Sequence, residues 1–145
     1  MNAASLYVDT SALFKWYLHE PFSDEFTNFI QQRPGAHIST LTVTEFHCSL
    51  ASRTRNHALT SALCAEVLAT FSAQTAAGFL SLLPVRDEFL AHATELIDSL
   101  KQPLHTLDAL HLAIAHASDC KDFATADKIQ AKAARTIGFN VHTFF

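Results

Sequence analysis

Residues 104–117 read LHTLDALHLAIAHA, and from Leu107 onward apolar side chains fall on nearly every side of the predicted helix. A helix that is apolar all round lies in the interior of a protein, where other elements cover it. This stretch therefore predicts a buried central helix over 107–117, in a protein built of packed layers.

Short strand-like runs alternate with helical patterns along the rest of the chain. We expect strands at 6–8, 36–39, 122–125 and 141–145, and a further apolar run at 79–85 is broken by Pro84. The spacing of apolar residues predicts helices at 12–18, 22–32, 41–55, 60–77, 88–101 and 127–137. Such alternation is typical of a parallel sheet covered on both faces. We expect an α/β fold, with one three-layer α/β/α domain over residues 1–145 and a central parallel sheet of four or five short strands.

The composition excludes several classes of protein. The chain has 145 residues, 49% of them hydrophobic, which suits one packed core and argues against disorder. Its formal net charge of −4 leaves no broad basic surface for nucleic acid. No apolar run approaches the ~18 residues of a membrane span, and the start MNAASLYVDTSALF lacks the pattern of a secretory signal. Three scattered cysteines support neither a disulfide framework nor a zinc knuckle, so we expect a cytoplasmic protein without membrane contact.

Four acidic residues stand where this fold is expected to bind its ligands. Asp9 ends the first strand, Glu45 lies early in the helix after the second, and Asp127 follows the 122–125 strand by two residues. Asp108 lies in the first turn of the buried helix. Because ligands bind beyond the carboxyl ends of parallel strands, we expect these carboxylates to share one edge of the sheet.

Each of these acids also has a structural explanation, which stays open. Asp9 can cap the first helix, and the segment from Thr42 to Glu45 fits a capping box in which Glu45 reaches back to Thr42. Asp108 and Asp127 each lie in a first helical turn, where the helix dipole favours a negative charge.

Taken together, the four acids favour a metal site. An unpaired carboxylate buried at Asp108 would be strongly unfavourable or would take up a proton. A hard divalent cation such as Mg²⁺ or Mn²⁺ removes the repulsion between clustered carboxylates. Acids on one edge of a sheet suit metal-assisted phosphodiester hydrolysis, in which the metal activates a water and stabilises charge on the phosphate.

Four segments resemble the acidic motifs of PIN-domain nucleases: YVDTSAL, TVTEF, LDALHLAIA and FATADKIQAKAA. They cover nearly the whole chain in order, and they are most similar to the VapC toxins of VapBC toxin–antitoxin pairs. The resemblance implies a PIN-like fold and a Mg²⁺- or Mn²⁺-dependent endoribonuclease with RNA as its substrate. It also implies a cognate antitoxin protein that covers the site, and a homodimer.

The same resemblance implies roles for individual residues. Asp9 and Asp108 match metal-binding positions, and Glu45 and Asp127 match the remaining acids of the catalytic metal site. The hydroxyl positions that support the site in the family are matched by Ser11 and Thr125.

Basic residues near these acids are candidates for contacts with RNA phosphates. Arg53 and Arg55 follow Glu45 on the same predicted helix, and Lys128 begins a stripe beside Asp127 that continues with Lys132 and Arg135. A solvated helix face explains the stripe equally well, so both interpretations stay open.

Two histidines flank Asp108 in the pattern H-x-x-D-x-x-H. His105 and His111 would lie about 120° apart around a helix, which is too wide for easy shared ligation of a metal. We therefore favour His105 in the preceding loop and His111 as an ordinary hydrogen-bonded residue of the helix.

The main alternative function is a catalytically inactive PIN-like module that binds RNA or protein. Two other α/β enzyme classes fit less well. A phosphatase of the haloacid dehalogenase type needs D-x-D after the first strand, where this chain has Asp9-Thr10-Ser11. A nucleotide-binding enzyme needs a glycine-rich loop, and none of the three glycines begins one.

Overall fold

The computed structural model describes residues 5–145; residues 1–4, which begin the segment considered as a secretory signal, lie outside the described residues. Its strands are β1 (Leu6–Val8), β2 (Ala36–Ser39), β3 (Leu80–Leu83), β4 (Asp122–Thr125) and β5 (Asn140–Thr143). Its helices are α1 (Thr10–Tyr17), α2 (Ser23–Gln31), α3 (Thr40–Arg55), α4 (Ser61–Ala76), α5 (Asp87–Ser99), α6 (Thr106–Ala117) and α7 (Lys128–Thr136). Each element lies within about two residues of its expected boundaries, as is usual for helix ends.

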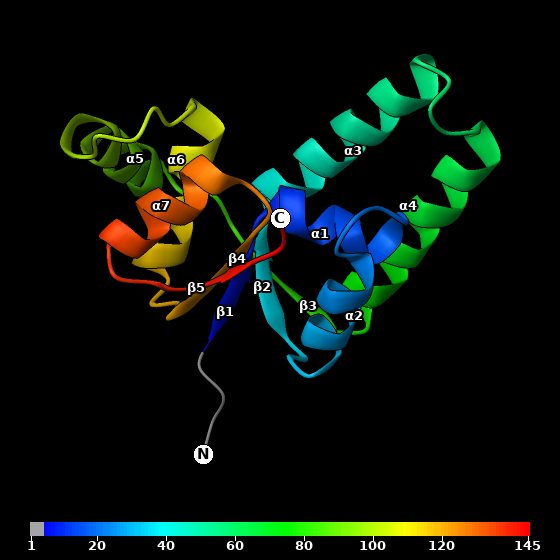
Figure 1. The fold of residues 1–145 in the computed structure, drawn as a ribbon, viewed down its shortest axis with the longest axis horizontal. Coiled ribbons are helices and arrows are strands. Elements are labelled where there is room, and N and C mark those ends of the chain that lie inside the picture. Colours follow the sequence, from blue (N-terminus) through cyan, green and yellow to red (C-terminus); the bar gives the residue numbers. More distant parts are fainter. Residues whose placement is uncertain (1–4) are drawn as a thin grey trace.

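The strands form one sheet in the order β3-β2-β1-β4-β5, and every neighbouring pair is parallel. The expected parallel sheet is confirmed, with five strands and with β5 at an edge. Because the strands are parallel, their carboxyl ends all lie at one edge of the sheet, toward the top of Figure 1. We call this the carboxyl edge.

Helices cover both faces of the sheet. Successive strand residues point to opposite sides, so each face carries side chains that are buried under helices. Leu6 and Val8 of β1 pack in a hydrophobic cluster with residues of α1 to α4, while Tyr7 packs in a second cluster with α5, α6 and α7. Figure 1 shows the same two groups of helices on opposite sides of the strands. The three-layer arrangement is therefore confirmed.

The apolar segment that predicted a layered fold is α6, and its residues 109–115 are all buried. It packs against α5, which covers its outer side. Asp108, at the start of α6, is half-buried, so the helix delivers one carboxylate from the core to the carboxyl edge. Among the helices of residues 5–145, none is long and apolar enough to cross a membrane.

Three helices begin directly at the carboxyl edge, each with a side-chain cap. Asp9 accepts a hydrogen bond from the backbone N–H of Ala12, and Asp127 accepts one from Gln130. At the start of α3, Ser39 forms a capping box with Thr42. The capping box between Thr42 and Glu45 is therefore wrong: α3 begins at Thr40, and its cap lies three residues earlier. The carboxylate of Glu45 lies beyond the first turn and is free for other partners.

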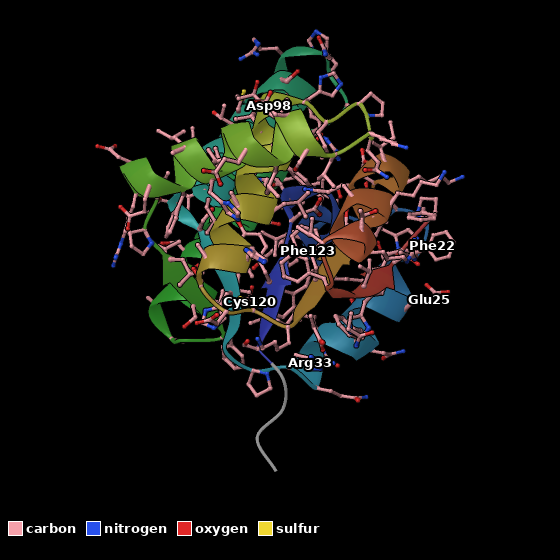
Figure 2. All side chains as sticks on the ribbon, turned by 90° about the vertical axis from the view of Figure 1, so that its left-hand side faces the viewer. Phe22, Glu25, Arg33, Asp98, Cys120 and Phe123 are labelled. Atoms are coloured by element: carbon pink, nitrogen blue, oxygen red, sulfur yellow. The ribbon has the colours of Figure 1, made fainter. Side chains whose placement is uncertain are left out.

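The opposite edge of the sheet holds a buried acid of a different kind. Asp122, at the start of β4, accepts hydrogen bonds from Arg33 (2.9 Å) and Asn140 (3.2 Å). Burial opposes ionisation of Asp122, but Arg33, Asn140 and His142 together hold its pKa below the ordinary value. Figure 2 shows Arg33 at the lower end of the molecule. Its guanidinium group stabilises the carboxylate of Asp122 at this edge of the sheet.

Candidate active site

Asp9 lies at the carboxyl end of β1 with only 4% of its surface exposed. Oδ1 accepts hydrogen bonds from Ser11 Oγ (2.7 Å) and Ala12 N (3.0 Å), and Oδ2 accepts one from Thr125 Oγ1 (2.8 Å). Thr125 is the last residue of β4, which neighbours β1. The structure thus places both hydroxyls, which match the supporting positions of the PIN-like site, on the carboxylate of Asp9. Three uncharged donors fix its orientation.

The charge of Asp9 is poorly compensated by the protein itself. Burial raises the pKa of Asp9 to about 6, although His111 and the hydrogen bonds from Ser11, Ala12 and Thr125 act in the opposite direction. Asp122 pairs with Arg33, whereas Asp9, Asp108 and Asp127 pair with no lysine or arginine of the described residues.

Asp108 and Asp127 bring two more carboxylates to the same edge. Both are half-buried. Burial raises the pKa of Asp108, and the negative charges of Asp127 and Glu45 raise it further. The charges that raise the pKa of Asp108 thus come from α3 and from the cap of α7. Carboxylates from α3, α6 and the α7 cap therefore share one electrostatic environment, as the fold predicted.

Glu45 is held by two partners on other helices. Its Oε1 accepts a hydrogen bond from Thr10 Oγ1 of α1 (2.8 Å) and another from His111 Nε2 of α6. The other ring nitrogen of His111 lies 2.6 Å from the hydroxyl of Tyr7, which in turn lies 2.9 Å from Ser39 Oγ. A continuous hydrogen-bonded chain thus runs from Ser39 to Glu45 through the buried edge.

The electrostatics of Glu45 follow from these contacts. Burial alone would raise its pKa, but the hydrogen bond and charge of His111, together with the Thr10 hydroxyl, bring the pKa below its ordinary value. Glu45 is consequently held in the ionised form. Because a carboxylate only accepts hydrogen bonds, the Nε2 atom of His111 carries the hydrogen in this contact.

His111 is the residue that the sequence did not identify as part of this site. It is buried and hydrogen-bonded, as expected, but its partner is a candidate catalytic acid 66 positions away. The available signal was its polarity within an apolar helix, since a buried imidazole requires partners. His105 is the exposed residue that precedes α6, as favoured from the sequence.

The three candidate substrate-binding residues have different surroundings. Arg53 Nη1 lies 3.8 Å from Glu20 Oε2, and the guanidinium carbon of Arg53 lies 4.7 Å from the centroid of the Phe14 ring. Arg55 is exposed at the end of α3, which extends away from the carboxyl edge in Figure 1. Lys128 is exposed directly after Asp127, with Nζ 5.4 Å from the ring of Phe145. Of these three residues, Lys128 is the one that is adjacent in sequence to one of the four acids.

The donor set at the carboxyl edge suits a hard divalent cation in kind. Its oxygens come from carboxylates, which Mg²⁺ and Mn²⁺ prefer, and no lysine or arginine of residues 5–145 pairs with the buried carboxylate of Asp9. As placed, however, no three His, Cys, Asp or Glu side chains among residues 5–145 converge closely enough to enclose an ion. Glu45 accepts a hydrogen bond from His111, and Asp127 accepts one from the backbone N–H of Gln130, so both carboxylates already have partners within the protein.

A broad apolar groove lies elsewhere on the described chain. It measures about 640 Å³ and runs between α3, α4 and β3, with an apolar lining that includes Val43, Leu68, Phe71 and Leu82. None of the four acids lines it. Its apolar character suits contact with another protein chain better than chemistry on a phosphate.

Comparison with known protein families matches residues 6–136 to the PIN domain. A search of curated proteins finds no match to the chain. The matched segment contains all four acids of the carboxyl edge.

Several solved structures share the fold. VapC20 of Mycobacterium tuberculosis, described as a toxin that cleaves the sarcin–ricin loop, is 14% identical with a TM-score of 0.69, over 89% of this chain and 95% of its own. VapBC2 of Rickettsia felis, bound to a promoter DNA fragment, is 14% identical with a TM-score of 0.72, over 97% and 98%. FitAcB of Neisseria gonorrhoeae is 17% identical with a TM-score of 0.64, over 97% and 96%. At such identities the likeness establishes the fold.

Proposed function

The chain belongs to the PIN domain family, and from this membership we propose that it is a metal-dependent endoribonuclease acting as the toxin of a toxin–antitoxin pair. The observation that carries the proposal is the buried carboxylate of Asp9. It is fixed by three uncharged donors, burial raises its pKa to about 6, and the charges of Asp127 and Glu45 raise the pKa of Asp108. Such an arrangement is unfavourable for the fold alone and favourable for binding a cation.

Asp9 and Asp108 would hold a Mg²⁺ or Mn²⁺ ion, with Glu45 and Asp127 completing the site directly or through water. A bound ion would supply activation of water and stabilisation of the charge that develops on the phosphate. Ser11 and Thr125 keep both oxygens of Asp9 fixed, which limits the reorganisation needed during reaction. One of the four carboxylates positions the attacking water and accepts its proton on a side-chain oxygen. Lys128, beside Asp127, contacts the RNA backbone.

The proposed partners follow from the relatives. Structures of VapBC and FitAB complexes that share this fold contain toxin and antitoxin together. By analogy, this chain binds a cognate antitoxin protein, forms a homodimer and acts on RNA in the cytoplasm. Co-expression with the reading frame immediately upstream, followed by purification and mass measurement of the complex, tests the antitoxin and the dimer.

The decisive experiment is cleavage of single-stranded RNA by the purified protein in Mg²⁺ or Mn²⁺, with and without EDTA. We expect cleavage in the wild type, none in EDTA, and none for Asp9→Asn or Asp108→Asn. Asp24→Asn, an exposed acid of α2, is the matched control and should cut normally.

Two outcomes would contradict the assignment. Cleavage that survives Asp9→Asn would show that the active site lies elsewhere or that a contaminant acts. Binding of RNA without any cleavage under divalent cations would favour the alternative, an inactive PIN-like binding module.

A further inference from the structure

Two histidines meet on the outer side of the α5–α6 pair, away from the acids. His92 Nε2 of α5 lies 3.0 Å from His116 Nδ1 of α6, and the ring centroids are 5.0 Å apart. His116 is exposed and His92 is half-buried, so solvent reaches the pair. The ring of Phe139 lies edge-on to His116, with the ring centroids 6.2 Å apart. We call His92 and His116 the histidine pair.

A nearby carboxylate favours one tautomer of His92. His92 Nδ1 lies 3.4 Å from Glu95 Oε2, one turn further along α5. A carboxylate only accepts, so Nδ1 carries the hydrogen and Nε2 presents its lone pair to His116. Histidines that bind metals characteristically donate their second ring N–H to a carboxylate in this way. In the absence of metal, His116 Nδ1 supplies the single hydrogen shared between the two rings.

The spacing of the two nitrogens suits a metal. With metal–nitrogen bonds of about 2.0–2.1 Å, two imidazoles on one ion are separated by about 2.9 Å at a right angle and about 3.4 Å in a tetrahedron. The observed 3.0 Å falls in this range. We propose that His92 and His116 bind one divalent first-row transition-metal ion of the Zn²⁺ class. Water molecules complete the coordination shell of the ion, and the contact between Nδ1 and Glu95 orients the ring of His92.

This site is separate from the carboxylates and independent of the proposed nuclease function. His116 lies eight positions after Asp108 on α6, which corresponds to about 12 Å along the helix. Imidazole nitrogens suit Zn²⁺, Ni²⁺ and Cu²⁺, whereas carboxylates suit Mg²⁺. The ion would join α5 to α6, the helix pair that holds Asp108 in place.

Calorimetric titration of the folded protein with ZnCl₂, in excess MgCl₂ to fill the carboxylate edge, tests the proposal. We expect saturable one-to-one binding in the wild type. His92→Ala and His116→Ala should abolish it, and Glu95→Gln should weaken it about tenfold. Asp108→Asn should bind Zn²⁺ as the wild type does, whether or not it cuts RNA.

The matched control is His47→Ala, because His47 is an exposed helical histidine beside the exposed Cys48, a competing place for Zn²⁺. Binding lost in His47→Ala, binding retained in both His92→Ala and His116→Ala, or no binding in the wild type would overturn the proposal. A measurement without substitution gives a second readout: ¹⁵N shifts of the His92 and His116 ring nitrogens should move on addition of Zn²⁺. Unchanged shifts at saturation would also contradict it.

Discussion

The Nε2 atom of His111 on α6 hydrogen-bonds to Oε1 of Glu45 on α3, although these helices cover opposite faces of the sheet. The contact passes over the carboxyl edge, and the hydroxyl of Tyr7, 2.6 Å from the other ring nitrogen, fixes the imidazole from below. His111 therefore couples the two helical layers at the point where the candidate catalytic acids gather.

His111→Ala is expected to impair both stability and cleavage. The change removes one of the two hydrogen-bond partners of both Glu45 and Tyr7 and leaves only Thr10 and Ser39, which should lower the free energy of unfolding by about 1–3 kcal/mol. Cleavage should fall mainly in kcat, because Glu45 loses its orientation, and His111→Gln should restore part of it. Urea unfolding and steady-state kinetics measure the two effects.

The control for His111 is His116→Ala on the same helix, which should leave cleavage unchanged because that side chain is exposed. Coupling between His111 and Glu45 should appear as non-additivity of about 0.5–3 kcal/mol in a double-mutant cycle of unfolding free energies. Additive effects would mean that the contact does not stabilise the protein.

Asp9→Asn should stabilise the protein at neutral pH while abolishing cleavage. The pKa of Asp9 is raised from 3.8 to about 6 in the folded state, so the folded protein binds more protons than the unfolded chain between these values. Stability of the wild type should fall as pH rises through this window, by at most about 3 kcal/mol, and remain lower above it. The amide of the variant lacks this pH dependence. Its Nδ2 can donate to Thr125, whose hydroxyl can turn to Gln130 Oε1 at 3.1 Å.

Thermal unfolding between pH 4 and pH 8 in EDTA measures this effect. The curves for wild type and Asp9→Asn should converge at low pH and separate above about pH 6. Parallel curves over the whole range would show that burial of Asp9 carries no ionisation penalty.

Divalent cations should raise the unfolding temperature of the metal-free protein. An ion bound only by the folded state at a hundred times its dissociation constant adds about 2.7 kcal/mol. Asp108→Asn should remove most of this gain, because it removes one proposed ligand and the repulsion that the ion relieves. Glu66→Gln, an exposed acid of α4, is the charge-matched control. An equal Mg²⁺ effect in both variants would place cation binding elsewhere.

We expect a structural role for Arg53 and a substrate-binding role for Lys128. Arg53→Ala removes the contact with Glu20 and the stacking over Phe14, which should cost about 1 kcal/mol of stability and leave RNA affinity unchanged. Lys128→Ala should weaken RNA binding and reduce the salt dependence of the affinity by about one counterion. Fluorescence anisotropy with labelled RNA, in the Asp9→Asn background, measures both. A larger loss for Arg53→Ala than for Lys128→Ala would reverse these roles.

Much of the fold could be predicted because its signals are local. The apolar run in 107–117 requires burial, and strand-like runs separated by helical patterns require a parallel sheet with helices on both faces. The edge shared by Asp9, Glu45 and Asp127 followed from the same topology, since Asp9 and Asp127 stand just after a strand and Glu45 lies early in the helix that follows β2. The order of strands and helices along the chain therefore predicted that these acids lie at one edge of the sheet.

Tertiary structure alone decided which side chains meet. Glu45 fits a capping box by sequence, yet Ser39 begins α3 earlier and releases Glu45 to a histidine 66 positions away. Arg53 is a plausible phosphate ligand by spacing, yet Glu20 and Phe14 already contact it. Local pattern determines the elements because backbone hydrogen bonding and burial act within a few residues. Partners of polar side chains depend on packing between distant segments, which no local pattern encodes.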